Sequence, residues 1–250
     1  MPNAVEHPYR AFERAGWGRA AAAYAGSFEH ATSLFGSALL RAGGTGPYVR
    51  LLDVACGTGA LSALAASQGA ETTGVDFSPQ MIAQARHRHP ALRFSEADAE
   101  ALPFPDRSFD AVVVKFGVHH FPFPVQALRE ARRVLRLGGR LAFTLRASPH
   151  EHAMYKLTLG AVEAAGVSRA ALPVPPGGAV NEISTCAALL AEFGSTPPLL
   201  QVDKIVADLW LDSDQQLIDI LIYGMVRLSC MIESQPAAKV DKILAAGTRS

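Results

Sequence analysis

The sequence predicts an α/β fold with a doubly wound, mostly parallel, Rossmann-like sheet and helical lid segments. Short apolar runs with the composition of buried strands recur along the chain, and segments with helical spacing separate them. Regular alternation of buried strands and helices is typical of a parallel sheet covered on both faces. The expected strands are 50–55, 71–76, 92–95, 109–115, 139–146 and 201–209, and the expected helices are 60–68, 79–88, 124–136 and 184–193.

The run LLDVACGTG at 51–59 joins the first strand to a glycine turn that can open a helix. Gly57 and Gly59 permit backbone angles that other residues disfavour. The first N–H groups of the following helix have no partner within the helix, so the turn presents positive backbone dipoles to an anionic ligand group. This stretch therefore predicts a cofactor site.

The length of 250 residues favours one domain. We expect a helical cap at 1–45, a cofactor-binding core at 46–148, a lid insert at 149–182, and a C-terminal part of the core with a lid helix at 183–250. The 23 Lys and Arg balance the 23 Asp and Glu, which argues against nucleic acid as a partner.

Cysteine use and hydropathy favour a cytoplasmic protein. Cys56, Cys186 and Cys230 are widely separated, so neither a metal site nor a disulfide framework is expected. Glu6 and Glu13 interrupt an N-terminus that lacks the apolar core of a signal peptide. The apolar stretch 217–232 is shorter than a membrane span and carries two charges, so it is predicted to be a soluble helix without membrane insertion. If the helix at 217–232 is exposed, it can pair with a second copy of the chain, so the sequence is compatible with a homodimer.

Three carboxylates indicate which kind of nucleotide cofactor the predicted site binds. A third glycine of the dinucleotide pattern is missing, because Ser62 occupies its place. Asp53 would repel a diphosphate but would accept the ammonium of an aminoacyl group. Asp76, 19 residues beyond Gly57, can accept both ribose hydroxyls, or it can cap the next helix. Asp98 follows the third strand, where an adenine amino group would be read; the alternative is a solvated loop acid. A nicotinamide oxidoreductase is the weaker alternative.

Five segments in register carry a family resemblance. LLDVACGTG, GVDFSP, EADAEALPFPDRSFD, HHF and VLRLGGRLAF, over about residues 48–146, closely resemble the class I S-adenosylmethionine-dependent methyltransferases. Within that class the chain is most similar to the ubiquinone/menaquinone methyltransferase-like branch. The resemblance implies a seven-stranded Rossmann-like sheet, S-adenosylmethionine as cofactor and S-adenosylhomocysteine as its product.

The chain departs from the family pattern at two places. Ala55 replaces a glycine often found there, a change that some members tolerate. After Ile232 the sequence has no apolar run that could form the usual closing antiparallel strand. The sequence leaves open whether the chain stops before that strand or the sheet ends at its sixth strand.

The resemblance also implies roles for single residues. The turn from Ala55 to Gly59 holds the methionine end together with Asp53, Asp76 holds the ribose hydroxyls, and Asp98 with Ala99 holds the adenine. The pattern from Trp17 to Tyr24 resembles a family cap that brings a tyrosine over the methionine; an aromatic of a core helix is the alternative reading. The predicted cofactor-binding set is Tyr24, Asp53, Ala55, Gly57, Gly59, Asp76, Phe77, Met81, Asp98, Ala99 and Lys115.

Methyl transfer is an in-line displacement at an activated sulfonium, so the protein mainly aligns the reactants and excludes water. A base can add proton removal, and His119 and His120 after the fourth strand are the candidates because imidazoles titrate near physiological pH. Packing against the cofactor is the alternative role for both histidines.

We therefore predict a methyltransferase acting on O, N or C of a small aromatic or heteroaromatic metabolite. The segment Lys115–Val118 lacks the polar-Pro-Pro-aromatic motif of nucleic-acid adenine methyltransferases, which favours a small molecule. The second hypothesis is a non-methylating enzyme that binds S-adenosylmethionine, such as a cyclase, because fold and cofactor do not fix the chemistry.

Overall fold

The computed structural model describes residues 6–146, 173, 175–176, 201–224, 226–236 and 240. Three helices precede the sheet, in the segment expected to be helical: α1 (Pro8–Tyr24), α2 (Phe28–Ser33) and α3 (Gly36–Ala42). Pro8 at the first turn of α1 suits a helix start, because proline has no N–H to leave unpaired there. The expected helix at 184–193 and most of the expected lid insert lie outside the described residues.

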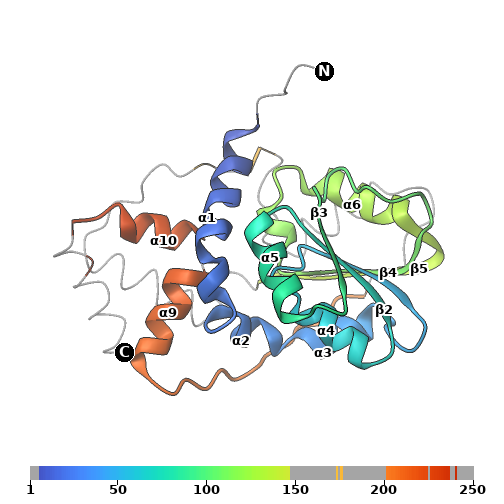
Figure 1. Ribbon diagram of the computed structural model, residues 1–250, viewed down its shortest axis with the longest axis horizontal. Helices are drawn as coiled ribbons and strands as arrows, with labels where there is room; N and C mark the ends of the chain where they lie inside the picture. The colour runs from blue at the N-terminus through green and yellow to red at the C-terminus, as the bar shows by residue number, and fades with distance from the viewer. Residues whose placement is uncertain are drawn as a thin grey trace.

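The described strands form one five-stranded, fully parallel sheet in the order β3-β2-β1-β4-β5. The order reverses direction between β1 and β4, as in doubly wound sheets. The predicted α/β, Rossmann-like fold is therefore confirmed (Figure 1). The strands are β1 (Arg50–Val54), β2 (Glu71–Asp76), β3 (Arg93–Glu96), β4 (Phe109–Lys115) and β5 (Leu135–Thr144).

Helices cover both faces of the sheet. On one face, α6 (Pro124–Val134) packs its apolar stripe, which includes Leu128, against Leu52 and Val112. On the other face, residues one step along the same strands pack against α3 and α4 (Ala60–Ser67). This alternation explains why the central strands β1 and β4 are mostly apolar: side chains on both of their faces are buried.

The boundary between α6 and β5 differs from the prediction. The helix was expected to reach residue 136, but it ends at Val134 and β5 begins at Leu135. The pairing of β4 with β5 shifts register after Leu135 and resumes at Arg140. Gly138, with φ +77°, lies in the bulged segment between them, where a left-handed backbone suits glycine.

The C-terminal part holds two further differences. Residues 201–209 were expected to form a strand, but they are irregular and mostly exposed, so this prediction is wrong. Their apolar side chains suggested burial, yet Val206 is 80% exposed and joins no sheet. The apolar stretch 217–232 forms two helices, α9 (Asp214–Gly224) and α10 (Val226–Glu233), in place of the one expected.

Helix α1 lies between the two halves of the molecule (Figure 1). It contacts α9 and α10 on one side and α5 (Pro79–Arg88), a helix of the sheet half, on the other. The carboxyl ends of all five parallel strands meet at one edge of the sheet. Ligands of open α/β sheets bind at that edge, next to the point where strand order reverses.

Candidate functional site

The turn after β1 adopts the left-handed geometry that its glycines predicted. Ala55, Gly57 and Gly59 have φ of +57°, +55° and +85°. Gly59 caps α4, and a Cβ added to it would lie 2.7 Å from Cζ of Phe94, so only glycine fits. Ala55 adopts the same region despite its Cβ, which is a strained conformation for alanine. The backbone therefore curls tightly at the carboxyl end of the sheet.

Asp53 lies on β1 just before this turn and is fully buried. Its Oδ2 accepts a hydrogen bond from Ser62 Oγ of α4 at 2.7 Å. Its Oδ1 is buried and has no hydrogen-bond partner among the described residues. Burial raises the pKa of Asp53 to about 6, although the Ser62 hydrogen bond opposes this. A buried acceptor without a partner is costly, so Oδ1 is suited to a donor supplied by a ligand.

Asp76 ends β2 and is tied to the turn. Its Oδ2 accepts from the Gly57 N–H and its Oδ1 from the Ser78 N–H, both at 2.9 Å. Burial raises its pKa to about 6 against these two hydrogen bonds. Ser78 in turn caps α5, since its Oγ accepts from the Met81 N–H at 3.3 Å. Asp76 thus takes part in the helix start, and each oxygen keeps a second lone pair for a ligand.

Asp98 and Ala99 lie in the loop after β3. Asp98 Oδ1 accepts from the Glu100 N–H at 2.9 Å, while its Oδ2 pairs with Arg10 of α1. Arg10 also pairs with Glu100, so one guanidinium from the N-terminal helix holds two acids of this loop. Ala99 is buried. Asp98 is therefore more than a solvated loop acid, because the Glu100 N–H and Arg10 both bind its carboxylate. Its expected role at the adenine stays a prediction.

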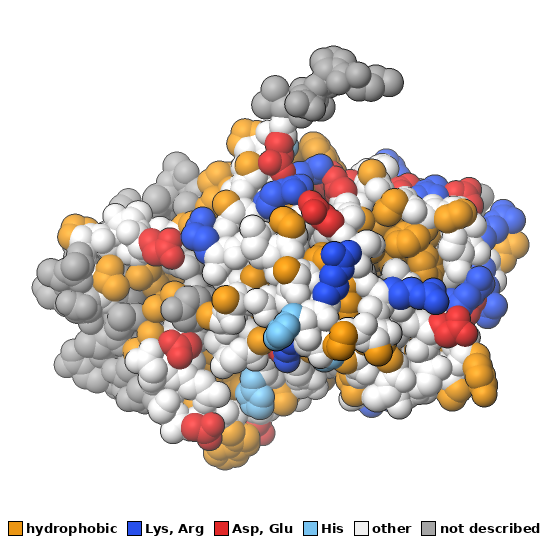
Figure 2. Space-filling view, viewed as in Figure 1, with side chains coloured by type: hydrophobic (Ala, Val, Ile, Leu, Met, Phe, Trp, Pro, Cys, Tyr) orange, Lys and Arg blue, Asp and Glu red, His pale blue; other side chains and the backbone are white. Residues whose placement is uncertain are grey.

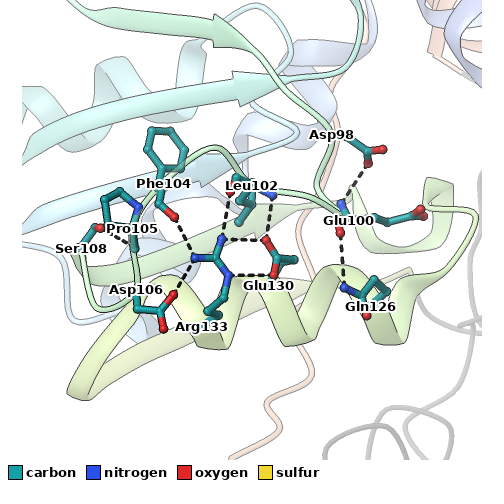
Figure 3. A network of polar contacts seen from close by, with 10 residues as sticks. All are labelled: Asp98, Glu100, Leu102, Phe104, Pro105, Asp106, Ser108, Gln126, Glu130 and Arg133. Carbon is teal, nitrogen blue, oxygen red and sulfur yellow. Dashed lines mark hydrogen bonds and ion pairs between the residues drawn. The ribbon is translucent and has the colours of Figure 1, made fainter. Parts of the chain in front are cut away.

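The rest of this loop is held by Arg133 of α6 (Figure 3). Its guanidinium donates to the carbonyl oxygens of Leu102 and Phe104 at 2.9 and 2.8 Å. It also pairs with Glu130 and Asp106 at 2.8 Å each. A planar guanidinium with several donors suits this arrangement, which fixes the loop that presents Asp98 and Ala99.

Lys115, the last residue of β4, faces the same region. Burial lowers the pKa of its ammonium, and the nearby carboxylates of Asp53 and Glu29 oppose that shift. A partly buried lysine near two carboxylates is a cation that can receive the carboxylate of an aminoacyl group. Lys115 therefore interacts electrostatically with Asp53, and its expected role at the cofactor stays a prediction.

The two histidines form the short 3-10 helix Val118–His120 after β4. Their rings lie 4.1 Å apart. His120 Nδ1 is 2.9 Å from Oε2 of Glu13 in α1, a fully buried carboxylate. Burial lowers the pKa of His119 well below its usual value, and its Nε2 has no partner among the described residues. The two candidate bases therefore have different surroundings.

Helix α1 lines the site with aromatic rings. Trp17 meets His120 edge-on at 5.0 Å and Tyr24 at 5.7 Å between ring centroids. A Cβ built on Gly57 would lie 3.9 Å from Cε1 of Tyr24, so this ring approaches the glycine turn. Burial raises the pKa of Tyr24 to about 12. Phe77, after β2, lies 5.8 Å from the Arg14 guanidinium of the same helix.

Sequence reasoning missed two buried acids of the N-terminal helices. In the sequence, Glu13 serves only as a charge that argues against a signal peptide, and nothing singles out Glu29. Glu29 accepts a hydrogen bond from the Thr58 hydroxyl of the turn and pairs with Arg88 of α5 at 2.8 Å. One signal was available for Glu13: it lies four residues from both Tyr9 and Trp17, on a helix face that is otherwise aromatic.

The comparisons with known proteins agree with this geometry. Residues 52–143 match the model of a family described as "Methyltransferase domain". A demethylmenaquinone methyltransferase of Beutenbergia cavernae is 45% identical over 108 residues, which are 43% of this chain and 45% of the relative. One of Thermus thermophilus is 50% identical over 98 residues, 37% of this chain and 44% of the relative.

Residues 52–143 are a methyltransferase domain. Over this segment the predicted family is confirmed, and with it S-adenosylmethionine as the cofactor. The chain spans less than half the length of these two methyltransferases. Over 144 residues it is also 38% identical to an uncharacterized protein of Mycobacterium tuberculosis strain H37Rv, 56% of this chain and 52% of that one.

Solved structures show the same fold over most of the chain. The YcgJ protein of Bacillus subtilis has a TM-score of 0.54 at 23% identity and covers 85% of this chain and 87% of its own. The [4+2]-cyclase SpnF has a TM-score of 0.52 at 23% identity and covers 85% and 73%. These likenesses concern the fold alone.

None of the helices among the described residues has the length and hydropathy that a membrane span requires. No group of three or more His, Cys, Asp or Glu among the same residues could hold a metal ion.

Proposed function

We propose that this chain transfers the methyl group of S-adenosylmethionine to O, N or C of a small aromatic or heteroaromatic metabolite. The observation that carries the proposal is the buried Asp53 carboxylate, whose Oδ1 lacks a partner beside a left-handed turn. An ammonium at this position would satisfy that oxygen and offset the burial of the charge. When bound, the cofactor supplies an activated methyl group.

The remaining residues of the predicted set fit the other parts of the cofactor. Asp76 is held by two backbone N–H groups, and we assign it the ribose hydroxyls. We assign the methionine carboxylate to Lys115, a partly buried cation that interacts electrostatically with Asp53, and the adenine to Asp98 and Ala99. We assign Phe77, Met81 and Tyr24 to the lining of this cradle; Met81 is buried on α5.

An aromatic methyl acceptor fits the rings that surround the site. Trp17 and Tyr24 meet edge-on along α1, and Phe35 meets Phe116 in the same way at 5.5 Å. Rings in such arrangements bind flat apolar molecules and exclude water from the reacting atoms. The demethylmenaquinone methyltransferases to which the chain is similar carry a quinone in their name, which favours an acceptor of that class.

The cofactor assignment is tested by calorimetric titration with S-adenosylhomocysteine. We expect Asp76→Asn to weaken binding by about 10²-fold, because two charge-assisted hydrogen bonds become weaker neutral ones. Asp208→Asn is the matched control, since Asp208 is exposed in the irregular segment. Equal affinities of wild type and Asp76→Asn would remove Asp76 from the ribose role.

Methyl transfer itself is tested with isotopically labelled S-adenosylmethionine and a panel of phenols, naphthohydroquinones and N-heterocycles. We expect the label in one of these products, detected by mass spectrometry. Tight cofactor binding without transfer to any member would instead favour the cyclase-like alternative. That alternative stays open because the fold is shared with a [4+2]-cyclase.

We further infer a cytoplasmic location and room for a homodimer. Cys56 and Cys230 are both free thiols, as expected in a reducing compartment. Trp210 is 84% exposed in the segment before α9 and could contribute to a contact between copies. Light scattering at two protein concentrations tests the oligomeric state.

A further inference from the structure

A buried carboxylate joins α1 to the loop after β4. Glu13 is fully buried, and its Oε2 accepts hydrogen bonds from Trp17 Nε1 at 3.1 Å and from His120 Nδ1 at 2.9 Å. Its Oε1 is buried without a partner among the described residues. Burying a carboxylate that has one oxygen without a hydrogen bond costs stability. This cost indicates that Glu13 has a role other than packing.

The contact fixes the tautomer of His120. A carboxylate oxygen only accepts hydrogen bonds, so the ring nitrogen that faces it carries the proton. With Nδ1 protonated, the neutral ring holds its free lone pair on Nε2. The indole of Trp17, edge-on at 89°, packs against the ring and restricts its rotation. Glu13, Trp17 and His120 therefore present a basic nitrogen on the side of the ring away from Glu13.

We infer that Glu13 is a positioning residue and that His120 Nε2 is the base that removes a proton from the methyl acceptor. This inference rests on the proposed methyl transfer and narrows its substrate. The acceptor is one whose reacting atom carries an acidic proton, such as a phenolic hydroxyl. A thiolate or tertiary amine would need no such base.

The proton and electrons balance without another reactant. The acceptor hydroxyl gives its proton to His120 Nε2, and the oxygen electron pair forms the bond to the methyl carbon. The bond between that carbon and sulfur breaks, and its electrons stay on sulfur. The imidazolium then faces the Glu13 carboxylate at 2.9 Å, which stabilises its charge until the proton passes to solvent.

His119 is less suited to this role. Its backbone carbonyl accepts a hydrogen bond from the Tyr9 hydroxyl of α1 at 3.3 Å, but its ring pairs with no carboxylate among the described residues that would fix its tautomer. Burial disfavours its charged form, and charges on His120 and Arg146 act in the same direction. The charge of His120, by contrast, acts on Asp76, so His120 lies near the carboxylate assigned to the ribose.

The tautomer can be measured without knowing the methyl acceptor. In the full chain labelled with ¹⁵N-histidine and bound to S-adenosylhomocysteine, NMR should show His120 protonated at Nδ1 and bare at Nε2. His120→Gln identifies the signal. Glu13→Leu should give a mixture of tautomers, while Glu6→Gln, the same loss of charge at an exposed site, should leave the signal unchanged. A wild-type signal from Nε2–H would overturn the inference.

Kinetics with two probes separate a base from a packing residue. 2-Naphthol keeps its proton in neutral buffer, whereas 4-nitrophenol is already ionised in mildly alkaline buffer. His120→Gln should lower kcat for 2-naphthol by about 10²-fold or more, the usual contribution of a general base, with little change in KM. With 4-nitrophenol the loss should stay within about threefold, since no proton has to be removed.

The Glu13 variants complete the test. Glu13→Leu should follow His120→Gln with a smaller loss, and Glu13→Gln serves where the leucine variant does not fold. An equal loss of kcat for both phenols would indicate packing and overturn the inference. If the wild-type chain transfers no label to any acceptor, the proposed methyl transfer fails, and the NMR tautomer alone decides whether Glu13 positions His120.

Discussion

The cofactor edge of the sheet and the N-terminal helices contribute to one site in different ways. At the sheet edge, the groups that matter are local: Gly57 N–H meets Asp76, 19 residues away in the sequence, through a parallel strand pair. The N-terminal helices contribute long-range contacts, such as Glu13 with His120, 107 residues apart. Backbone geometry organises the first region and buried charge organises the second.

This difference explains why the two regions respond differently to substitution. The sheet edge depends on left-handed backbone angles that only particular residues adopt without strain. The helices depend on acids such as Glu29 that are stable only while their cationic partners are present. Both kinds of dependence can be tested with matched pairs of variants.

The largest effect is expected at Gly59. Gly59→Ala places a Cβ 2.7 Å from Phe94 and 3.0 Å from His89, in addition to the strain of φ +85°. We expect a loss of about 3 kcal/mol in the free energy of unfolding, from strain and overpacking together. Chemical denaturation of the purified chain measures it.

Gly138→Ala is the matched control for this substitution. Its φ is +77°, yet no atom lies within 4 Å of an added Cβ. Only the backbone strain remains, so the expected loss is about 1 kcal/mol. Equal losses in the free energy of unfolding for the two variants would show that the contact between the added Cβ and Phe94 does not affect stability.

The next effect concerns the attachment of α2. Arg88 donates to both carboxylate oxygens of Glu29 at 2.8 Å, and Glu29 also accepts from the Thr58 hydroxyl. Arg88→Met leaves a buried carboxylate without its cation, which should lower the free energy of unfolding by about 2 kcal/mol. Because Thr58 belongs to the glycine turn, affinity for S-adenosylhomocysteine should fall as well.

A more exposed ion pair, between α1 and β3, provides the comparison. Arg14 and Glu96 are 3.2 Å apart, but both side chains are more than one-third exposed. Figure 2 shows acidic and basic side chains interspersed on the face of the molecule that it draws. Arg14→Met should cost no more than about 0.5 kcal/mol. A larger loss than for Arg88→Met would contradict the argument from burial.

The sequence predicted the sheet edge better than the helices because its signals are local. Glycine spacing, strand-end carboxylates and apolar runs are each visible within a short stretch of sequence. The partners of Glu13 and Glu29 come from distant segments, so no single stretch of sequence reveals them. The wrong strand at 201–209 has the same origin: its apolar composition suits a strand, but composition does not show whether a neighbouring strand is available.

The last expected effect concerns pH, where the sheet edge should show two opposite trends. Asp53 and Asp76 both have their pKa raised by burial from 3.8 to about 6. The folded chain therefore holds protons that the unfolded chain has released between those values. The stability that these groups contribute is fully present below about 3.8 and is lost as pH rises through about 6.

Binding of S-adenosylhomocysteine should change in the other direction, because its ammonium and ribose hydroxyls require the ionised carboxylates. Affinity should rise by up to about tenfold per pH unit and per proton released, up to pH 6, and level off above it. Melting temperatures with and without ligand across this range measure both trends at once. Asp76→Asn should reduce the pH dependence of both the stability and the affinity for S-adenosylhomocysteine. A ligand-induced shift that is constant across pH 6 would contradict the assignment of both carboxylates to the cofactor, because neutral and ionised side chains would then serve equally well.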